Sequence, residues 1–232
     1  MKNMKKKKVI FSYDYELFFG IMSGTVQKTL IEPTNLLLDC MESVSARGNF
    51  FIDYLMFECL EKLSDERAKS DLKLMKEQVK DMVRRGHRIE LHLHPHWIDA
   101  KYNGDGTWDY TDYTHYSLYS LDEDVRSRMF RDGTIYLTKL AREVDPDYTI
   151  CAFRAGGWTI QPFCILKDAL RRMELLLIHL LCMVYVKIIS TQSLISVMLP
   201  TKKYTGSWTM YVSKMKMVSL LKYRLRFIIE TY

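Results

Sequence analysis

Paired cysteines are missing from this sequence. Its 232 residues contain five scattered cysteines, an odd number, and no CxxC pair. An odd number of scattered cysteines does not indicate a disulfide framework, and the absence of a CxxC pair does not indicate a cysteine-rich zinc site. We therefore expect a protein of a reducing compartment.

Long apolar runs are also missing. The lysine-rich start MKNMKKKK resembles the first part of a signal peptide, but Asp14 and Glu16 stand where the apolar part would follow. The apolar run at residues 175–186 is shorter than the roughly 20 residues that span a bilayer. These absences predict a cytoplasmic protein with no membrane partner.

Excess positive charge is confined to the C-terminal residues. The chain carries a net charge of +6, but residues 171–232 contain ten Lys+Arg against two Asp+Glu, and residues 1–170 contain 24 against 26. The first 170 residues are thus slightly acidic. Since a nucleic-acid footprint needs basic residues on the folded domain, we expect no nucleic-acid partner.

Turn-forming residues vanish in the same C-terminal part. Residues 171–232 contain no Asp, Asn or Ala, and Gly206 is their one glycine. A continuing pattern of strands and helices would need such residues between its elements. We therefore expect a domain at residues 8–170 and an atypical tail at 171–232. Three interpretations of the tail stay open: translation out of frame, a membrane-associating segment, or a divergent continuation of the domain.

The first 170 residues alternate between strand and helix patterns. Alternation of this kind predicts an α/β fold with parallel strands joined by right-handed crossovers. A capping-box pattern at Ser120 and Glu123 starts one of the helices. The expected strands are residues 8–13, 49–53, 88–94 and 148–153, and the expected helices lie within 33–48, 54–63, 65–85, 120–143 and 160–170.

Three histidines stand close together in the segment RIELHLHPHW at residues 88–97. Its apolar and polar residues alternate, which predicts a half-buried strand whose polar face carries His92 and His94 together. Pro95 should end the strand, because proline cannot donate to a sheet. Imidazoles gathered at a strand end suit a transition metal. The alternative is a surface strand end with solvated histidines.

Polar residues follow two other expected strands. Asp14 and Glu16 come at the end of the first strand, and Arg154 follows the fourth. Active sites of barrels and open parallel sheets lie at the carboxyl ends of the strands. The coincidence of these three positions favours an enzyme.

Three motifs resemble a known family. SYDYE at residues 12–16, HLHPH at 92–96 and FRAGGW at 153–158 resemble, in order, the first three motifs of the NodB-like polysaccharide deacetylases, a carbohydrate esterase family. The nearest branch is the one associated with lipopolysaccharide biosynthesis. The resemblance implies a distorted (β/α) barrel, of which this chain holds the first four βα units. It also implies a divalent metal, most often Zn2+, and removal of N- or O-acetyl groups from an acetylated sugar or polysaccharide.

The resemblance also implies roles for single residues. It makes Asp14 the general base, His92 and His96 metal ligands, and Arg154 the residue that orients the base. The family usually has an aspartate directly after the base as its third ligand, and here Tyr15 stands at that position. We expect Glu16 to supply this carboxylate, with Asp14 itself as the alternative ligand. His94 is additional: a further ligand, a support for a ligand, or a loop histidine.

Other interpretations remain open beside this one. The pair His92 and His94 also fits the H-x-H motif of metal hydrolases of the amidohydrolase or PHP type. Trp97, Trp108 and Trp158 could stack against sugar rings or pack the loop. The family's downstream general-acid histidine would fall in the tail, where His179 comes too soon after Arg154. We therefore expect impaired deacetylation, and the alternative is a non-catalytic remnant that binds carbohydrate or metal.

Overall fold

The computed structural model of the protein describes residues 8–18, 23–158, 164–177, 196–198, 210–212 and 226–230. The chain divides into two units, residues 1–178 with 225–232, and residues 179–224. In the second unit, strand β8 (Ser196–Met198) pairs antiparallel with β9 (Met210–Val212). His179 and most of the tail lie outside the described residues, so the interpretations of the tail stay open.

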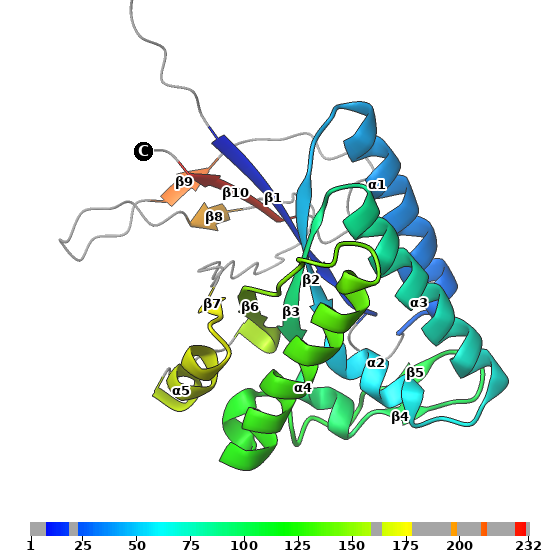
Figure 1. Ribbon diagram of the computed structural model, residues 1–232. Coiled ribbons are helices and arrows are strands. Elements are labelled where there is room, and N and C mark those ends of the chain that lie inside the picture. The colour runs from blue at the N-terminus through cyan, green and yellow to red at the C-terminus, as the bar shows by residue number, and fades with distance from the viewer. Residues whose placement is uncertain are drawn as a thin grey trace, which may run out of the picture. The chain divides into compact units, whose positions relative to one another are not determined.

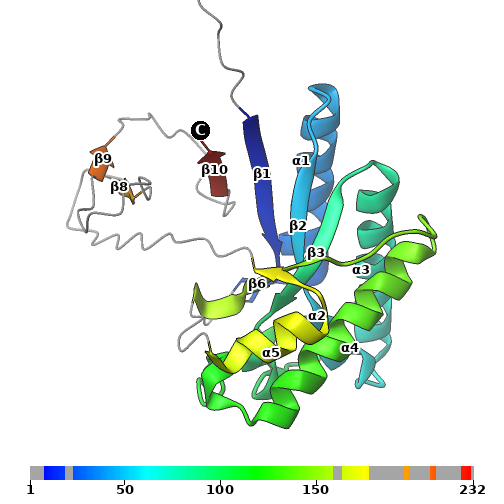
Figure 2. The same ribbon diagram turned by 60° about the vertical axis from the view of Figure 1, so that its left-hand side comes forward.

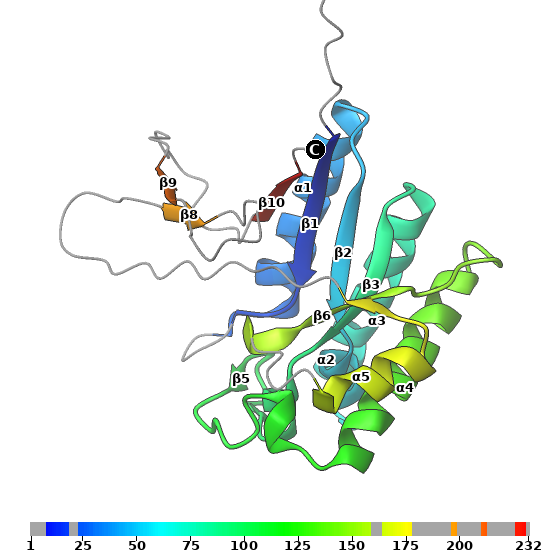
Figure 3. The ribbon, with the colours of Figure 1, turned by 90° about the vertical axis from the view of Figure 1, so that its left-hand side faces the viewer.

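A parallel sheet forms the centre of the first unit. Strands β1 (Lys8–Tyr15), β2 (Gly48–Asp53), β3 (Arg88–Leu93) and β6 (Ala152–Ala155) pair in this order and curl into a half-barrel (Figure 3). Short β7 (Leu176–Leu177) extends the sheet beyond β6, and β10 (Arg226–Glu230) pairs antiparallel with β1. The α/β class is thus confirmed, and the sheet is compatible with part of a (β/α) barrel.

Helices join these strands as the alternating pattern predicts. In Figure 1, α1, α3 and α4 lie on one side of the strands, and in Figure 2 α5 lies along α4. A π-helical segment, Val26–Ile31, leads into α1. The helices are α1 (Glu32–Ser43), α2 (Tyr54–Glu61), α3 (Glu66–Arg84), α4 (Glu123–Arg142) and α5 (Cys164–Arg172).

The loop after β3 has short elements of its own. A 3-10 turn, Pro95–Ile98, follows the strand directly. Residues 103–107 join β4 (Lys101–Tyr102) to β5 (Trp108–Asp109), and Gly104 and Gly106 in this turn have positive φ. A second 3-10 turn, Leu118–Ser120, precedes α4, and a third, Gly156–Trp158, follows β6.

The two faces of the sheet differ in chemistry. Alternate residues of a strand point to opposite faces, and the face under the helices carries aromatic and aliphatic side chains such as Tyr15, Ile52 and Leu91. The other face carries Ser12, Asp53, Glu90, His92 and Arg154, and all five are buried. The prediction of a half-buried β3 is therefore wrong, because its polar face is covered as fully as its apolar face.

Two predicted boundaries shift for identifiable reasons. Helix α4 begins at Glu123 after Asp122, and the Ser120 hydroxyl donates to the Ser117 carbonyl (2.7 Å) instead of capping the helix. Strand β6 begins at Ala152, not at residue 148. The Glu90 carboxylate accepts the N–H groups of Cys151 (2.9 Å) and Ala152 (2.8 Å), so these amides bond to a side chain and not to the strand ladder.

A search of the described residues for membrane-spanning helices gives a negative result. None of their helices combines the length and the apolar character that crossing a bilayer requires.

A buried histidine lies at the amino ends of the strands. His87 is 2% exposed, and its Nδ1 accepts the N–H of Gly48 (3.1 Å), which places the ring proton on Nε2. Nε2 has no hydrogen-bond partner among the described residues. Burial, with help from Arg47 and Arg85, lowers the pKa of His87 below its usual value. The folded protein therefore holds this ring neutral.

We expect His87 to make the protein less stable in acid. The pKa of His87 in the unfolded chain is 6.5. Below this pH the unfolded chain binds a proton at His87, whereas the folded protein keeps the ring neutral. The free energy of unfolding should fall as the pH drops, by up to about 1.4 kcal/mol per pH unit. In the variant His87→Asn the side-chain amide oxygen can still accept the Gly48 N–H, but the side chain no longer binds a proton as the pH falls. Thermal melting of both proteins between pH 5 and 7 measures the difference, and parallel curves would contradict this role.

Candidate metal centre

The register of the sheet places three charged residues side by side. Asp53 of β2 pairs with His92 of β3, and His92 pairs with Arg154 of β6. Paired residues in neighbouring parallel strands share a face, so these side chains lie together at the carboxyl edge of the sheet. Glu16 follows β1 at the same edge. The predicted meeting of the first, third and fourth strand ends is confirmed.

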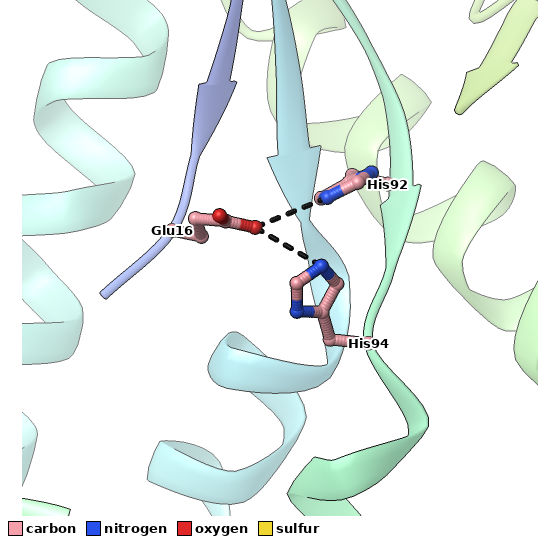
Figure 4. A group of neighbouring side chains, drawn as sticks. All are labelled: Glu16, His92 and His94. Atoms are coloured by element: carbon pink, nitrogen blue, oxygen red, sulfur yellow. Dashed lines mark hydrogen bonds and ion pairs between the residues drawn. The ribbon is translucent and has the colours of Figure 1, made fainter. Parts of the chain in front are cut away.

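One carboxylate and two imidazoles converge at this edge. Glu16 Oε2 lies 3.1 Å from His92 Nε2 and 3.1 Å from His94 Nε2, as Figure 4 shows. Each of the three residues offers one ligand atom, and these three atoms lie within 4.8 Å of one another. Ligands of a tetrahedral zinc ion lie roughly 3.3–3.5 Å apart. The donor set and its spacing could therefore hold a metal ion.

The second ring nitrogen of His92 is held by the backbone. His92 Nδ1 lies 2.7 Å from the carbonyl oxygen of Arg154. Because a carbonyl can only accept, Nδ1 carries a proton, and Nε2 is the ring nitrogen that faces Glu16. Such contacts fix the orientation of metal-binding imidazoles. Burial disfavours the charged form of His92, but the carboxylates of Asp14 and Glu16 outweigh it and raise its pKa to about 9.

Asp14 and Arg154 form the contact that the motifs predict. The Arg154 guanidinium donates to Asp14 Oδ1 and to the Ser12 hydroxyl. Its Cζ also lies 3.8 Å from the centre of the Phe51 ring. Both charged side chains are almost fully buried. Arg154 thus holds Asp14 in one orientation beside the metal group, since the Asp14 charge acts directly on His92.

His96 lies next to this group and is not part of it. Its ring meets the rings of His94 and Tyr110 edge-on, with centroids 5.0 Å apart in each case, and stacks on Trp97. Burial, followed by the neighbouring His94, lowers the pKa of His96 to about 3. The structure therefore gathers the histidine pair with spacing two and not the pair with spacing four that the resemblance implies.

Asp53 is a site residue that sequence reasoning missed. Its carboxylate is fully buried and accepts hydrogen bonds from the His94 N–H (3.3 Å) and the Trp97 indole N–H (2.6 Å). Burial raises the pKa of Asp53, against the opposing influence of His94 and His92. The available signal was its place at the end of the second strand, where it completes the row of polar strand ends.

The tryptophans lie in the interior. Trp97 and Trp108 are 2% and 3% exposed, and their rings meet edge-on with centroids 4.8 Å apart. They pack the loop against the sheet, so their faces are not free for a sugar ring. The Trp158 side chain lies outside the described residues. The exposed aromatic residues between β3 and α4 are Tyr113, Tyr116 and Tyr119.

Gly156 makes room for His94. A Cβ atom on Gly156 would lie 1.8 Å from His94 Cδ2 and 2.4 Å from the Leu93 carbonyl oxygen. Neither neighbour can give way freely, because the His94 ring is buried beside Glu16 and the Leu93 oxygen is backbone. The first glycine of the FRAGGW motif is thus required for the position of His94.

We expect Gly156→Ala to displace His94 and to weaken metal binding by at least about tenfold, the usual effect of disturbing a residue that supports a ligand. Gly104→Ala serves as the control, since no atom lies within 4 Å of a Cβ at that position and the backbone strain from its positive φ falls on an exposed turn. Zinc titration with a competing chelator measures the affinity. Equal affinities for the two variants would show that His94 does not bind the metal.

Metal binding should also depend on pH through His92. With a pKa of about 9, the His92 ring of the metal-free protein carries a proton at pH 7 that the metal must displace. We expect the affinity to rise by up to about tenfold per pH unit between pH 6 and 8, with release of a proton. Calorimetry in two buffers of different protonation enthalpy measures this release. Asp14→Asn removes the main charge that raises this pKa and should make the pH dependence shallower.

Two comparisons with known proteins bear on this site. No family model and no curated protein matches the chain. The relation to the polysaccharide deacetylases therefore remains a resemblance carried by three motifs.

Proposed function

We propose that this protein holds a divalent metal, Zn2+, at Glu16, His92 and His94, and that it hydrolyses acetyl groups of an acetylated sugar or polysaccharide. The observation that carries the proposal is the convergence of Glu16 with His92 and His94 beside the Asp14–Arg154 pair. Three distant segments of the chain supply these groups, and all three match motifs of the NodB-like deacetylases.

Each residue has a chemical task in this proposal. The metal, when bound, would polarise the acetyl carbonyl and acidify the attacking water. Asp14 accepts the proton of that water as general base. Arg154 keeps the Asp14 carboxylate aimed at the water, and the Arg154 carbonyl keeps His92 turned with Nε2 toward the metal. The products are acetate and the free amine or hydroxyl of the sugar.

The leaving group also needs a proton, and its source limits the rate. Among the described histidines outside the motif, His87 lies at the other end of the strands, and His115 Nδ1 lies 2.9 Å from Asp99 in the loop. His179 lies outside the described residues. We therefore propose that this chain deacetylates slowly. The second candidate function is binding of metal or carbohydrate without turnover. It is favoured because no described histidine outside the motif is placed to protonate the leaving group.

The role of Asp14 separates the two candidates. We expect Asp14→Asn to lower acetate release from an oligomer of N-acetylglucosamine by about 100- to 10,000-fold, as loss of a general base does. Metal stoichiometry should be unchanged, because Glu16, His92 and His94 remain. Asp112→Asn, on the exposed part of the loop, serves as the matched control. Acetate is measured with an enzyme-coupled assay on zinc-loaded protein.

Two results would decide against deacetylation. One is zinc-loaded wild-type protein that releases no more acetate than the Asp14→Asn variant, which would leave the binding function. The other is a protein with mutated Glu16 that still binds zinc at full stoichiometry, which would remove the metal centre itself.

A further inference from the structure

A cavity of about 390 Å³ lies beside Trp97, within the first unit. Helix α2, the first turns of α4 and the loop from Trp97 to Trp108 surround it. Its volume falls within the roughly 300–1,000 Å³ of small-molecule sites. The lining contains none of the three metal-binding residues, so the cavity is separate from the centre described above.

The lining of the cavity is mainly apolar. Leu55, Val125, Met129 and the two indoles Trp97 and Trp108 contribute to it. The Cys59 thiol donates to the Trp97 carbonyl oxygen (3.3 Å), and burial raises its pKa to about 12, so that it stays neutral. An apolar cavity of this size favours a ring or a short hydrocarbon chain over a sugar, because sugar hydroxyls would find few partners here.

Charged residues are gathered on one part of the lining. Arg128 and Lys62 both approach a single oxygen, Glu58 Oε1, at 2.8 Å and 3.4 Å. One carboxylate thus faces two cations, and the Arg128 and Lys62 side chains are 39% and 65% exposed. Beyond the cavity, Asp132 lies 3.8 Å from Arg128 but pairs more closely with Arg131, at 2.9 Å. These three cations and two carboxylates together carry a net charge of +1.

We propose that this cavity is a second binding site and that it takes a small molecule with an apolar body and one anionic group. The apolar body would fill the space beside Leu55, Trp97 and Met129. The anionic group would meet Arg128 and Lys62 and balance their excess charge. Trp97 joins the site to the metal centre, because it lines the cavity and donates its indole N–H to Asp53.

The dye 8-anilino-1-naphthalenesulfonate has this chemistry and serves as the probe. We expect one dye to bind per full-length chain, with rising dye fluorescence. Ala100 lines the cavity and Ala46 lies at the other end of the strands, and both are partly buried against the core. Ala100→Phe should fill the cavity and abolish binding, whereas the matched variant Ala46→Phe should bind as the wild type does. Equal dye binding by these two variants would overturn the proposal.

The charge preference has a separate test that does not depend on filling the cavity. Arg128→Gln should weaken binding of the sulfonate dye by up to about fivefold, the upper end of what loss of one partly exposed charge contact causes. Binding of N-phenyl-1-naphthylamine, a similar body without the anionic group, should not change. If the variant binds both dyes equally less well, or binds both as the wild type does, the proposal that the site prefers an anionic ligand is wrong. Thermal melting of each variant verifies that it is folded.

Discussion

The register of the parallel strands is the constraint on which this site depends. Because Asp53, His92 and Arg154 are direct neighbours across β2, β3 and β6, a shift of one residue in any of these strands would turn a charged side chain to the helix-covered face. The apolar residues between them prevent that shift, since Ile52, Leu91 and Phe153 are fully buried in the core. The packing of the core thus sets the geometry of the metal centre.

Burial of the polar face has a consequence for stability. A buried charged group is costly unless it is paired or hydrogen-bonded. On this face Glu90 accepts two backbone N–H groups of the β6 segment, His92 contacts the Arg154 carbonyl, and Arg154 binds Asp14 and Ser12. The same contacts that orient the site residues therefore hold β6 against β3. Loss of one partner would disturb both the site and the sheet.

Sequence reasoning identified what local pattern determines. The alternating strands and helices, the strand end at Pro95 and the contact of Arg154 with Asp14 all follow from spacing and motif. It missed Asp53, the interior position of Trp97 and Trp108, and the full burial of β3. These features depend on how the sheet curls and on which face each loop packs against, and a single sequence carries no direct record of either.

The packing of the loop after β3 decides which histidine lies beside Glu16. Asp53 accepts both the His94 N–H and the Trp97 indole N–H, so it holds the two ends of the turn that begins at Pro95. With these two points fixed, the His94 ring lies toward Glu16, and the His96 ring lies between His94, Trp97 and Tyr110. Spacing alone permits either histidine to reach a metal. The aromatic packing of the loop, anchored on one buried carboxylate, selects the pair with spacing two.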